Sequence, residues 1–446
     1  MRVLLYGLGR SGLAAGRLLR RQGHEPVWYD RRDDGADVVA AGRAGWTRVG
    51  GPLDSGAELC IAAPGVPIDH PDLVRLRAAG METIGEVEWV ARTIDAPILG
   101  VTGTAGKGTV TRWTEAMLHG AGIDAVAGGN LDPALSAVAE PGRWLVTELS
   151  SFQLERCPTL HPRIAVVTVL GRDHLDRHGD LATYHALKRR LLAHLGPEDT
   201  AVLNADDPLQ DAWSEGTPAR IVRYGLTSSS AHAHVRDERI RLGPHDLGPV
   251  AALGPPGRHQ RANLLAAAAA AEAAGAPPQA IAATIPTLAS APGRHELVGL
   301  HCGVRFVDDS IATRELAVAA ALEAATPPIA WIVGGRDKGA DPDAVRALVP
   351  GRVAQVIGIG EAGPAFVRAF ASDAPGRVVS DADGRTAMRA AVRLGAETVR
   401  GQGGGTVLLA PLASSFDQFR DHEERGRVFR DAVAALSREV PWTACS

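Results

Sequence analysis

The stretch Gly100-Val-Thr-Gly-Thr-Ala-Gly-Lys-Gly-Thr109 follows the short apolar segment Pro97-Ile-Leu99 and precedes a helical pattern over residues 110–118. A strand, a glycine-rich turn and a helix in this order predict a phosphate-binding loop, because backbone N–H groups of the turn and of the helix N-terminus point toward the anion. Lys107 adds a mobile cation, and Thr109 offers a hydroxyl to Mg²⁺. Glycine is needed because a side chain would block the approach of the backbone to phosphate.

The turn departs from the G-x-x-x-x-G-K-[ST] pattern at two positions. Val101 stands at the first glycine position, and Gly108 follows the lysine. The alternative to a nucleotide site is a tight strand–helix turn with a solvated lysine. The strand before the turn and the helix after it favour the nucleotide site.

Length and composition limit the class of protein. A chain of 446 residues predicts two or three domains, and 45% hydrophobic with 22% charged residues is ordinary for a globular protein. The formal net charge is −4 and there is no long basic block, so a nucleic-acid partner is not expected. The run Ala266 to Ala271 is low in complexity, but it is typical of an alanine-rich helix rather than of disorder.

Cysteine usage and the N-terminus predict the compartment. The N-terminus enters a strand directly at Val3-Leu-Leu-Tyr6 and Arg10 soon follows, which is unlike a signal peptide. No charge-free apolar run approaches the ~20 residues that a spanning helix needs. We therefore expect a cytoplasmic protein without membrane insertion. Scattered cysteines with no C-x-x-C pair argue against a disulfide framework or a cysteine zinc site and fit a reducing cytoplasm; they are Cys60, Cys157, Cys302 and Cys445.

A dinucleotide-type fingerprint opens the chain. The strand at Val3-Leu-Leu-Tyr6 leads into Gly7-Leu-Gly-Arg-Ser-Gly12, and a second strand at Pro26-Val-Trp-Tyr29 ends at Asp30. This pattern ordinarily suggests NAD. The same geometry binds any diphosphate, however, because the helix N-terminus recognises charge and not nicotinamide. Together with the separate phosphate loop, it predicts two different nucleotide sites.

Strands and helices alternate in three successive blocks, which predicts an α/β protein of three domains. A linker at Thr93-Ile-Asp-Ala-Pro97 and a boundary at Ser290-Ala-Pro-Gly293 separate the blocks. The expected domains are residues 1–93, 94–290 and 291–446.

Two polar residues follow buried strands near the phosphate loop. Glu148 comes after Trp144-Leu-Val-Thr147, and His174 comes soon after Ile164-Ala-Val-Val-Thr168. The carboxyl ends of parallel strands face the ligand crevice, so these side chains are candidates to hold Mg²⁺ on the nucleotide. Mg²⁺ prefers oxygen, which makes the histidine unusual. Each residue taken alone is more often an ordinary polar loop residue.

Lys188 lies in the helical segment Tyr184-His-Ala-Leu-Lys-Arg-Arg190. Composition favours a solvated helix face for this lysine. A chemical role requires a lowered pKa, so that the neutral amine can react. Sequence spacing does not decide between the two.

The ordered motifs resemble those of the Mur ligases, and most closely those of the member that adds D-glutamate. The resemblance extends over essentially the whole chain. The strings Glu148-Leu-Ser-Ser-Phe-Gln-Leu-Glu155 and Ser415-Phe-Asp-Gln-Phe419 indicate the D-glutamate-adding member. The other matching elements are Gly103 to Thr109, Gly128-Gly-Asn130, His174-Leu-Asp-Arg177, Lys188, Asn204-Ala-Asp-Asp207, Asn263, Gly293-Arg-His-Glu296, Asp309-Ser-Ile-Ala-Thr313, Gly334-Gly-Arg-Asp-Lys338 and Pro411-Leu-Ala-Ser414.

The resemblance implies the fold and the first substrate site. It implies a Rossmann-like N-terminal domain, a central P-loop ATPase domain with a mainly parallel sheet, and a Rossmann-like C-terminal domain. The N-terminal domain would hold UDP-N-acetylmuramoyl-L-alanine. The matching residues are Gly9, Arg10, Ser11, Asp30, Arg31, Arg32 and, beside the substrate, Asn130.

The resemblance also implies an ATP site with two Mg²⁺ ions. The residues that match catalytic positions of the family are Lys107, Glu148, His174 and Lys188. The residues that match its metal ligands are Thr109, Glu148, His174 and Lys188. Lys188 matches a lysine that is carbamylated by CO₂, which turns a cation into an anionic ligand. The matching ATP contacts are Gly103, Thr104, Ala105, Gly106, Lys107, Gly108, Thr109, Asn263, Arg294 and Asp309.

The implied reaction is the ATP-dependent addition of D-glutamate to UDP-N-acetylmuramoyl-L-alanine in peptidoglycan precursor synthesis, by a monomer. The substrate carboxylate attacks the γ-phosphate to give an acyl phosphate and ADP, and the amine of D-glutamate then attacks the acyl phosphate. The residues that match the amino-acid site are Thr313, Lys338, Ser415 and Phe416.

The chain departs from the family pattern at several contacts, and the departures affect details of ATP and amino-acid binding more than the reaction class. Gly108 stands where Ser or Thr usually binds Mg²⁺. The related folylpolyglutamate synthases also have glycine there, followed by a hydroxyl residue, so Thr109 is the expected substitute. The remaining departures are Ala105, Gln260, Ile311, Arg314 and His422.

Three alternative functions compete with this interpretation. One is a related Mur-type or folylpolyglutamate-type ligase that uses a different amino acid or acceptor. A nicotinamide oxidoreductase would use the N-terminal fingerprint but would leave Lys107 and Lys188 without a role. A regulatory nucleotide-binding protein without turnover is favoured only if the departures abolish metal binding.

Overall fold

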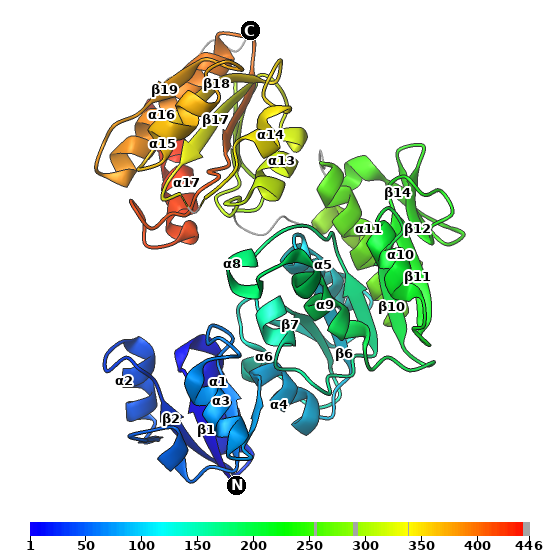
Figure 1. Cartoon of the computed structure of the whole chain (residues 1–446). Coiled ribbons are helices and arrows are strands. Elements are labelled where there is room, and N and C mark those ends of the chain that lie inside the picture. The colour runs from blue at the N-terminus through cyan, green and yellow to red at the C-terminus, as the bar shows by residue number, and fades with distance from the viewer. Residues whose placement is uncertain (254–256, 289–292, 338, 440–446) are drawn as a thin grey trace. The chain divides into compact units, whose positions relative to one another are not determined.

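The computed structural model of the chain describes residues 1–253, 257–288, 293–337 and 339–439. The chain forms two compact units, one of residues 1–254 with 261–288 and one of residues 255–260 with 289–446. Three β-sheets flanked by helices make it an α/β protein, as the sequence predicts (Figure 1). The first unit contains two sheets, so the boundary expected at residues 93/94 lies inside a compact unit. The boundary expected at residues 290/291 lies outside the described residues.

The N-terminal sheet has five parallel strands in the order β3-β2-β1-β4-β5. A Cβ on Gly12 would lie 2.7 Å from the carbonyl oxygen of Gly7, so glycine allows helix α1 to start directly against the end of β1. The strands are β1 (Arg2–Tyr6), β2 (Glu25–Tyr29), β3 (Thr47–Arg48), β4 (Leu59–Ala62) and β5 (Glu82–Ile84). The helices are α1 (Gly9–Arg21), α2 (Ala36–Arg43), η1 (Leu53–Ser55), α3 (Pro71–Ala78) and α4 (Glu86–Thr93).

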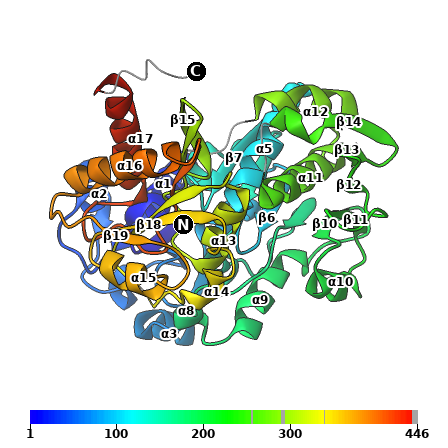
Figure 2. The ribbon, with the colours of Figure 1, turned by 90° about the horizontal axis from the view of Figure 1, so that it is seen from above.

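The central sheet has nine strands in the order β14-β13-β12-β11-β10-β9-β6-β8-β7. It is parallel except at one edge, where β13 runs antiparallel to both neighbours. The strands of this edge are labelled at the right of Figure 2. The strands are β6 (Ile98–Thr102), β7 (Ala125–Gly129), β8 (Trp144–Glu148), β9 (Ile164–Val167), β10 (Thr200–Asn204), β11 (Arg220–Gly225), β12 (Ala233–Arg236), β13 (Arg239–Leu242) and β14 (His245–Pro249). Strand β6 lies between β8 and β9, so the loops that follow all three meet at one edge.

The helices of the central region are α5 (Lys107–Gly120), α6 (Leu135–Val138), α7 (Ser151–Leu154), α8 (Leu175–His178), α9 (Leu181–Arg189), η2 (Arg190–Leu192), α10 (Pro208–Ser214), η3 (Val250–Leu253), α11 (Arg258–Ala273), α12 (Pro278–Thr284) and η4 (Ile285–Thr287). The alanine run Ala266 to Ala271 is helical as predicted, and it is buried in the same core cluster as Val101 and Val166. Alanine suits this position because its small side chain lets a helix pack closely without losing rotamer entropy.

The C-terminal sheet has six strands in the order β15-β16-β20-β17-β18-β19, and only the edge strand β15 is antiparallel. The strands are β15 (Glu296–His301), β16 (Val304–Asp308), β17 (Ile329–Gly334), β18 (Val353–Ile359), β19 (Gly376–Val378) and β20 (Gly405–Leu409). The helices are α13 (Glu315–Ala324), α14 (Asp343–Arg346), α15 (Gly363–Ala369), α16 (Gly384–Arg400) and α17 (His422–Glu439).

The cysteines and the helix lengths bear on the expected compartment. Cys60 and Cys157 are free and buried, and burial raises the pKa of the Cys60 thiol to about 12. Cys302 is disulfide-bonded, which the scattered cysteines of the sequence did not predict. In the described part of the chain, no helix combines the length and apolar character needed to cross a membrane.

The packing of α11 predicts the effect of enlarging its side chains. Ala268→Leu should lower the free energy of unfolding by ~1–3 kcal/mol, because Ala268 is fully buried and the added carbons must displace neighbouring core atoms. Ala283→Leu on α12 is the matched control, since Ala283 is exposed and its substitution should change stability little. Urea unfolding curves of both variants measure the difference, and equal effects would contradict the packing argument.

Candidate active site

The predicted phosphate loop is a strand, a turn and a helix in the structure. β6 leads into the turn at residues 103–106, and α5 follows it. Gly103 has φ +145° and Gly106 has φ +83°, which side chains rarely adopt. A Cβ on Gly103 would overlap the Thr168 hydroxyl, and a Cβ on Gly106 would overlap the amide of Asn263. The turn therefore requires glycine at both positions, for conformation and for space.

Side chains from neighbouring segments fix this loop. The Thr168 hydroxyl donates to the carbonyl oxygen of Ala105 at 2.7 Å. The Thr104 hydroxyl accepts from the backbone N–H of Gly171 at 2.9 Å, and the Tyr184 hydroxyl donates to it at 3.2 Å. Sequence reasoning missed Thr168 and Tyr184 as supports of the loop, because only the fold brings them to it.

Lys107 lies over the loop that precedes it. Its Nζ donates to the carbonyl oxygens of Gly103 at 3.0 Å and Thr104 at 3.1 Å. Gly108 and Thr109 are buried in the first turn of α5. The amino group of Lys107 is thus hydrogen-bonded to the turn that the sequence predicts to bind phosphates.

Lys188 is buried rather than solvated. It lies on α9 with 1% of its surface exposed, so the solvated helix face that composition favours is wrong. Its Nζ donates to the carbonyl oxygen of Gly103 at 2.7 Å and lies 4.4 Å from the centre of the Tyr184 ring. Two lysine side chains therefore converge on Gly103.

This environment changes the protonation of Lys188. Burial, together with the charge of Lys107, lowers the pKa of its ammonium to about 6, against the carboxylates of Asp173 and Glu148. At neutral pH the amine is therefore mostly uncharged, and an uncharged amine has a free lone pair. This is the property that a chemical role requires and that spacing in the sequence could not show.

Glu148 connects to the N-terminal fingerprint through Asn130. The buried carboxylate of Glu148 ends β8, and its Oε1 accepts from Asn130 Nδ2 at 2.7 Å. The carbonyl oxygen of Asn130 accepts from Arg10 Nη2 at 2.8 Å, and Arg10 also lies 3.5 Å from an Asp132 carboxylate oxygen. Asn130, which is predicted for the UDP substrate, thus lies next to the predicted metal ligand Glu148 and is hydrogen-bonded to Arg10.

His174 occupies a left-handed position before α8, with φ +53°. Its ring lies 4.7 Å from the Phe152 ring centre and 6.5 Å from that of Tyr184. Its Nε2 is 3.4 Å from a carboxylate oxygen of Asp173. Tyr184 therefore contacts both His174 and Lys188.

Carboxylates and histidines alone do not form a metal site here. Among the residues that the structure describes, no three His, Cys, Asp or Glu side chains gather into a group that could hold a metal ion. The predicted ligand set contains two such residues, Glu148 and His174, with Thr109 and Lys188 as the other members. A neutral lysine is a poor ligand for Mg²⁺, which takes oxygen.

The N-terminal fingerprint forms the turn expected for a diphosphate. Gly9, Arg10 and Ser11 open α1, and Gly9 has φ +89°. The Asp30 carboxylate accepts from the backbone N–H of Leu8 at 2.9 Å and from Arg32 Nη2 at 3.0 Å. Hydrogen bonds from Arg32 hold the pKa of Asp30 down at about 2. Asp30 therefore shapes the turn in addition to any contact with a substrate.

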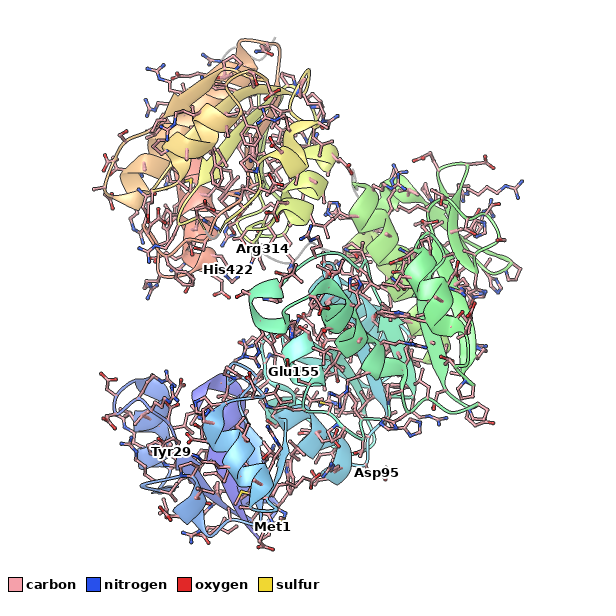
Figure 3. All side chains as sticks on the ribbon, viewed as in Figure 1. Met1, Tyr29, Asp95, Glu155, Arg314 and His422 are labelled. Atoms are coloured by element: carbon pink, nitrogen blue, oxygen red, sulfur yellow. The ribbon has the colours of Figure 1, made fainter. Side chains whose placement is uncertain are left out.

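Polar residues that sequence reasoning missed surround Arg31, which is exposed. The Tyr6 hydroxyl donates to an Asp72 carboxylate oxygen at 2.6 Å, and the His70 ring contacts both Tyr6 and Arg31. Tyr6 and Tyr29 end neighbouring parallel strands, with ring centres 5.4 Å apart. Tyr29 is labelled in Figure 3. The position of both tyrosines at the carboxyl ends of β1 and β2 is the signal that could have identified them.

The second unit contains the remaining predicted contacts. Asp309 follows β16 and is buried, and the His295 ring nitrogen lies 3.8 Å from its carboxylate. Ser415 is buried after β20, whereas Phe416 is 56% exposed. Arg294 is partly buried, and Thr313 donates its backbone N–H to Ile311 at 2.8 Å. Lys338 lies outside the described residues.

Comparison with known proteins identifies the family. Residues 101–271 match the model of the Mur ligase middle domain. The UDP-N-acetylmuramoylalanine–D-glutamate ligase of Thermus thermophilus is 44% identical over 449 aligned residues, which cover 99% of each chain. The chain belongs to the Mur ligase family. The enzyme of the same name from Deinococcus radiodurans is also 44% identical, over 98% of this chain and 92% of its own.

Solved structures of other Mur ligases share the fold. The UDP-N-acetylmuramate–alanine ligase MurC of Thermotoga maritima matches with a TM-score of 0.62 at 16% identity, over 98% of this chain and 100% of its own. The MurF ligase of the same organism, in complex with ADP, matches with a TM-score of 0.62 at 18% identity, over 93% and 96%. The α/β fold with three sheets predicted from the sequence is therefore the fold of this family.

Lysine usage is a signal of the site that sequence reasoning missed. Of 47 basic Lys and Arg residues, only Lys107, Lys188 and Lys338 are lysines. All three were assigned to the site from other arguments. Arginine stays charged in proteins, whereas lysine loses its proton readily when buried. Two of these three lysines, Lys107 and Lys188, donate to the same carbonyl oxygen, that of Gly103.

The support of the loop by Thr168 predicts the effect of removing its hydroxyl. Thr168→Val should cost ~0.5–1.5 kcal/mol of stability, because the partly buried carbonyl of Ala105 loses its donor. The same change should raise the KM for ATP, since the turn loses a restraint. Thr114→Val on α5 is the control: the Thr114 hydroxyl is buried with no hydrogen-bond partner in the described residues, so its removal should be neutral or stabilising. Thermal unfolding and ATP kinetics compare the two variants. Equal changes in stability and in the KM for ATP would contradict the role of Thr168 in supporting the loop.

Proposed function

We propose that this protein is an ATP-dependent ligase that joins D-glutamate to UDP-N-acetylmuramoyl-L-alanine in peptidoglycan precursor synthesis. The observation that carries the proposal is the full-length similarity, at 44% identity, to UDP-N-acetylmuramoylalanine–D-glutamate ligases. The buried lysine beside a phosphate loop supports the reaction class. We further propose a cytoplasmic monomer with domains at residues 1–93, 94–290 and 291–446.

The ATP phosphates would lie on the turn at residues 103–109. The backbone N–H groups of the turn and the N-terminus of α5 supply positive potential there. Lys107 donates to the carbonyls of Gly103 and Thr104, so its ammonium lies beside the turn that would hold the phosphates. The further ATP contacts that we propose are Asn263, whose amide packs on Gly106, and Arg294 and Asp309.

Mg²⁺ binding requires a change at Lys188, and the local chemistry fits that change. The uncharged amine of Lys188 can attack the carbon of CO₂ and lose a proton to solvent, which gives an anionic carbamate with two oxygens. Lys107, which shares the Gly103 carbonyl with Lys188, provides positive charge nearby. The carbamate, Glu148, His174 and Thr109 would then hold two Mg²⁺ ions. When bound, the ions would neutralise charge on the phosphates.

The UDP substrate would bind at the N-terminal fingerprint. We propose contacts from Gly9, Arg10, Ser11 and the Asp30-Arg31-Arg32 segment at the end of β2, with Asn130 beside the acyl group. The hydrogen bonds from Arg10 to Asn130 and from Asn130 to Glu148 support this placement, because they bring the fingerprint close to the proposed metal ligands. D-Glutamate would bind through Thr313, Lys338, Ser415 and Phe416.

The reaction then proceeds in two steps. The terminal carboxylate of the L-alanyl group attacks the γ-phosphorus of ATP, which forms an acyl phosphate and releases ADP. Lys107 neutralises charge that develops on the transferred phosphoryl group. The amine of D-glutamate attacks the acyl carbon, and the tetrahedral intermediate collapses to the amide with loss of phosphate and a proton.

The assay of this reaction tests the proposal directly. The purified protein should form one ADP for each amide product when given UDP-N-acetylmuramoyl-L-alanine, D-glutamate, ATP and Mg²⁺. Omission of either the acceptor or D-glutamate should abolish ADP formation, and L-glutamate is the matched control. ADP formation that depends on another amino acid would instead support a related ligase, and no acceptor-dependent ADP would exclude the ligase reaction.

Removal of the Lys188 amine should abolish most activity. Lys188→Ala should lower kcat by roughly 10²-fold or more, the scale for loss of one group that stabilises transition-state charge. Short carboxylates such as formate should restore part of the rate by replacing the carbamate in the space that alanine leaves. Lys188→Arg keeps a cation that cannot react with CO₂, so it should be inactive and should not respond to formate. A ¹³C NMR carbamate signal from ¹³CO₂ should appear in the wild type alone, and a fully active Lys188→Ala variant would refute this role.

A further inference from the structure

Arg425 on α17 is a completely buried cation that the proposed reaction does not use. It has 0% of its surface exposed. Its Nη1 donates to the carbonyl oxygen of Ala413 at 3.1 Å, and its Nη2 donates to the carbonyl oxygen of Ser310 at 2.8 Å. Burial lowers the pKa of Arg425 to about 10, so the fold bears a cost in keeping the charge there. The two hydrogen bonds offset part of that cost, and they join the guanidinium to two separate loops.

The two carbonyls belong to two loops at the same edge of the C-terminal sheet. Ser310 lies in residues 309–313, which follow β16, and Ala413 lies in residues 411–416, which follow β20. β16 and β20 are neighbouring parallel strands, so their loops leave the sheet side by side. The guanidinium bridges them with two N–H donors held in one plane, which fixes direction as well as distance.

A third loop joins the same cluster. After β17, the backbone N–H of Arg336 donates to the carbonyl oxygen of Ser414 at 2.8 Å, and the N–H of Ser414 donates to that of Arg336 at 3.0 Å. The N–H of Leu412 donates to the carbonyl oxygen of Ala312 at 3.0 Å. A Cβ on Gly335 would lie only 3.1 Å from Arg425 Nη1. The Arg425 guanidinium therefore fills the point where the three loops meet.

Helix α17 holds this guanidinium in place through its neighbours. Arg430, further along the helix, pairs with the buried Asp308 carboxylate at 2.7 Å. A Cβ on Gly426 would lie 2.6 Å from both Asp308 Oδ2 and Ser310 Oγ, so α17 packs directly on the end of β16. The packing of α17 thus holds the backbone of Arg425, and the two carbonyl oxygens hold its guanidinium.

The two loops that Arg425 bridges carry three of the residues proposed above for D-glutamate: Thr313, Ser415 and Phe416. We propose that Arg425 is a positioning residue for the amino-acid substrate, which acts by locking the loops after β16 and β20 into the geometry that the substrate carboxylates require. The proposal rests on the proposed ligase function for the identity of the substrate. The locking of the loops rests on the geometry alone.

The variants Arg425→Met and Arg425→Lys test the proposal. Arg425→Met keeps the apolar stem but leaves both carbonyls without their donor, so the KM for D-glutamate should rise at least tenfold. The KM for the UDP substrate should stay within twofold. The KM for ATP should rise less than that for D-glutamate, because only one proposed ATP contact, Asp309, lies in a loop that Arg425 bridges. Arg425→Lys keeps the charge but lacks the planar guanidinium, so its KM for D-glutamate should lie between those of the wild type and Arg425→Met. If Arg425→Met does not fold, the KM of Arg425→Lys tests the proposal.

Two controls on the same helix separate positioning from general destabilisation. Phe429 is fully buried in the core of α17, so Phe429→Leu should lower the melting temperature without changing the KM for D-glutamate. Arg427 is exposed, and Arg427→Met should change neither quantity. A Phe429→Leu variant with the same selective rise in KM would overturn the proposal, as would Arg425 variants with a wild-type KM or with all three KM values raised equally.

Hydrogen exchange of the full chain gives a readout that does not depend on activity. Arg425→Met should lose amide protection in residues 309–313 and 411–416 together, while Phe429→Leu should not. If the wild type shows no D-glutamate-dependent ADP formation, the proposed function fails, and the exchange result still decides whether Arg425 locks the loops. Unchanged protection in both loops would overturn the inference even in an active ligase.

Discussion

The hydrogen bond from the buried Lys188 amine to the carbonyl oxygen of Gly103 is the contact on which the site depends. It joins α9 to the turn after β6, 85 residues away along the chain. Lys107 donates to the same carbonyl, so two amines share one acceptor. Two neighbouring ammonium groups repel each other, and the more deeply buried one is therefore the one that gives up its proton. Burial and local charge together therefore lower the pKa of the Lys188 amine.

The requirement for glycine in the turn follows from the same crowding. Thr168 and Asn263 approach the backbone so closely that any Cβ at Gly103 or Gly106 would collide with them. Both contacts come from segments that are distant in the sequence. The conformation of the loop therefore depends on these packing contacts as well as on its glycines.

Local features of the fold were predictable from the sequence, and features created by distant contacts were not. The strand, turn and helix around Lys107 follow from apolar runs and glycine spacing, and the alanine helix follows from propensity. The burial of Lys188 depends on Tyr184, Thr104 and Gly103 meeting in space, so a helix-face pattern gave the wrong environment. Arg425 went unnoticed for the same reason: a fully buried arginine runs against the usual preference of that side chain. In the second unit, Arg314 and His422 were expected from the resemblance to depart from the family pattern. They lie on the segments after β16 and β20 (Figure 3).

The scarcity of lysine makes this molecule unusually easy to follow by spectroscopy. Three lysines and the N-terminal amine are the only primary amines in 446 residues. Isotope labelling of lysine side chains would give a spectrum with three signals, one for the phosphate loop, one for the buried amine of α9 and one for the C-terminal unit. Each stage of substrate loading would then be visible at a separate frequency, without assignment of the rest of the chain.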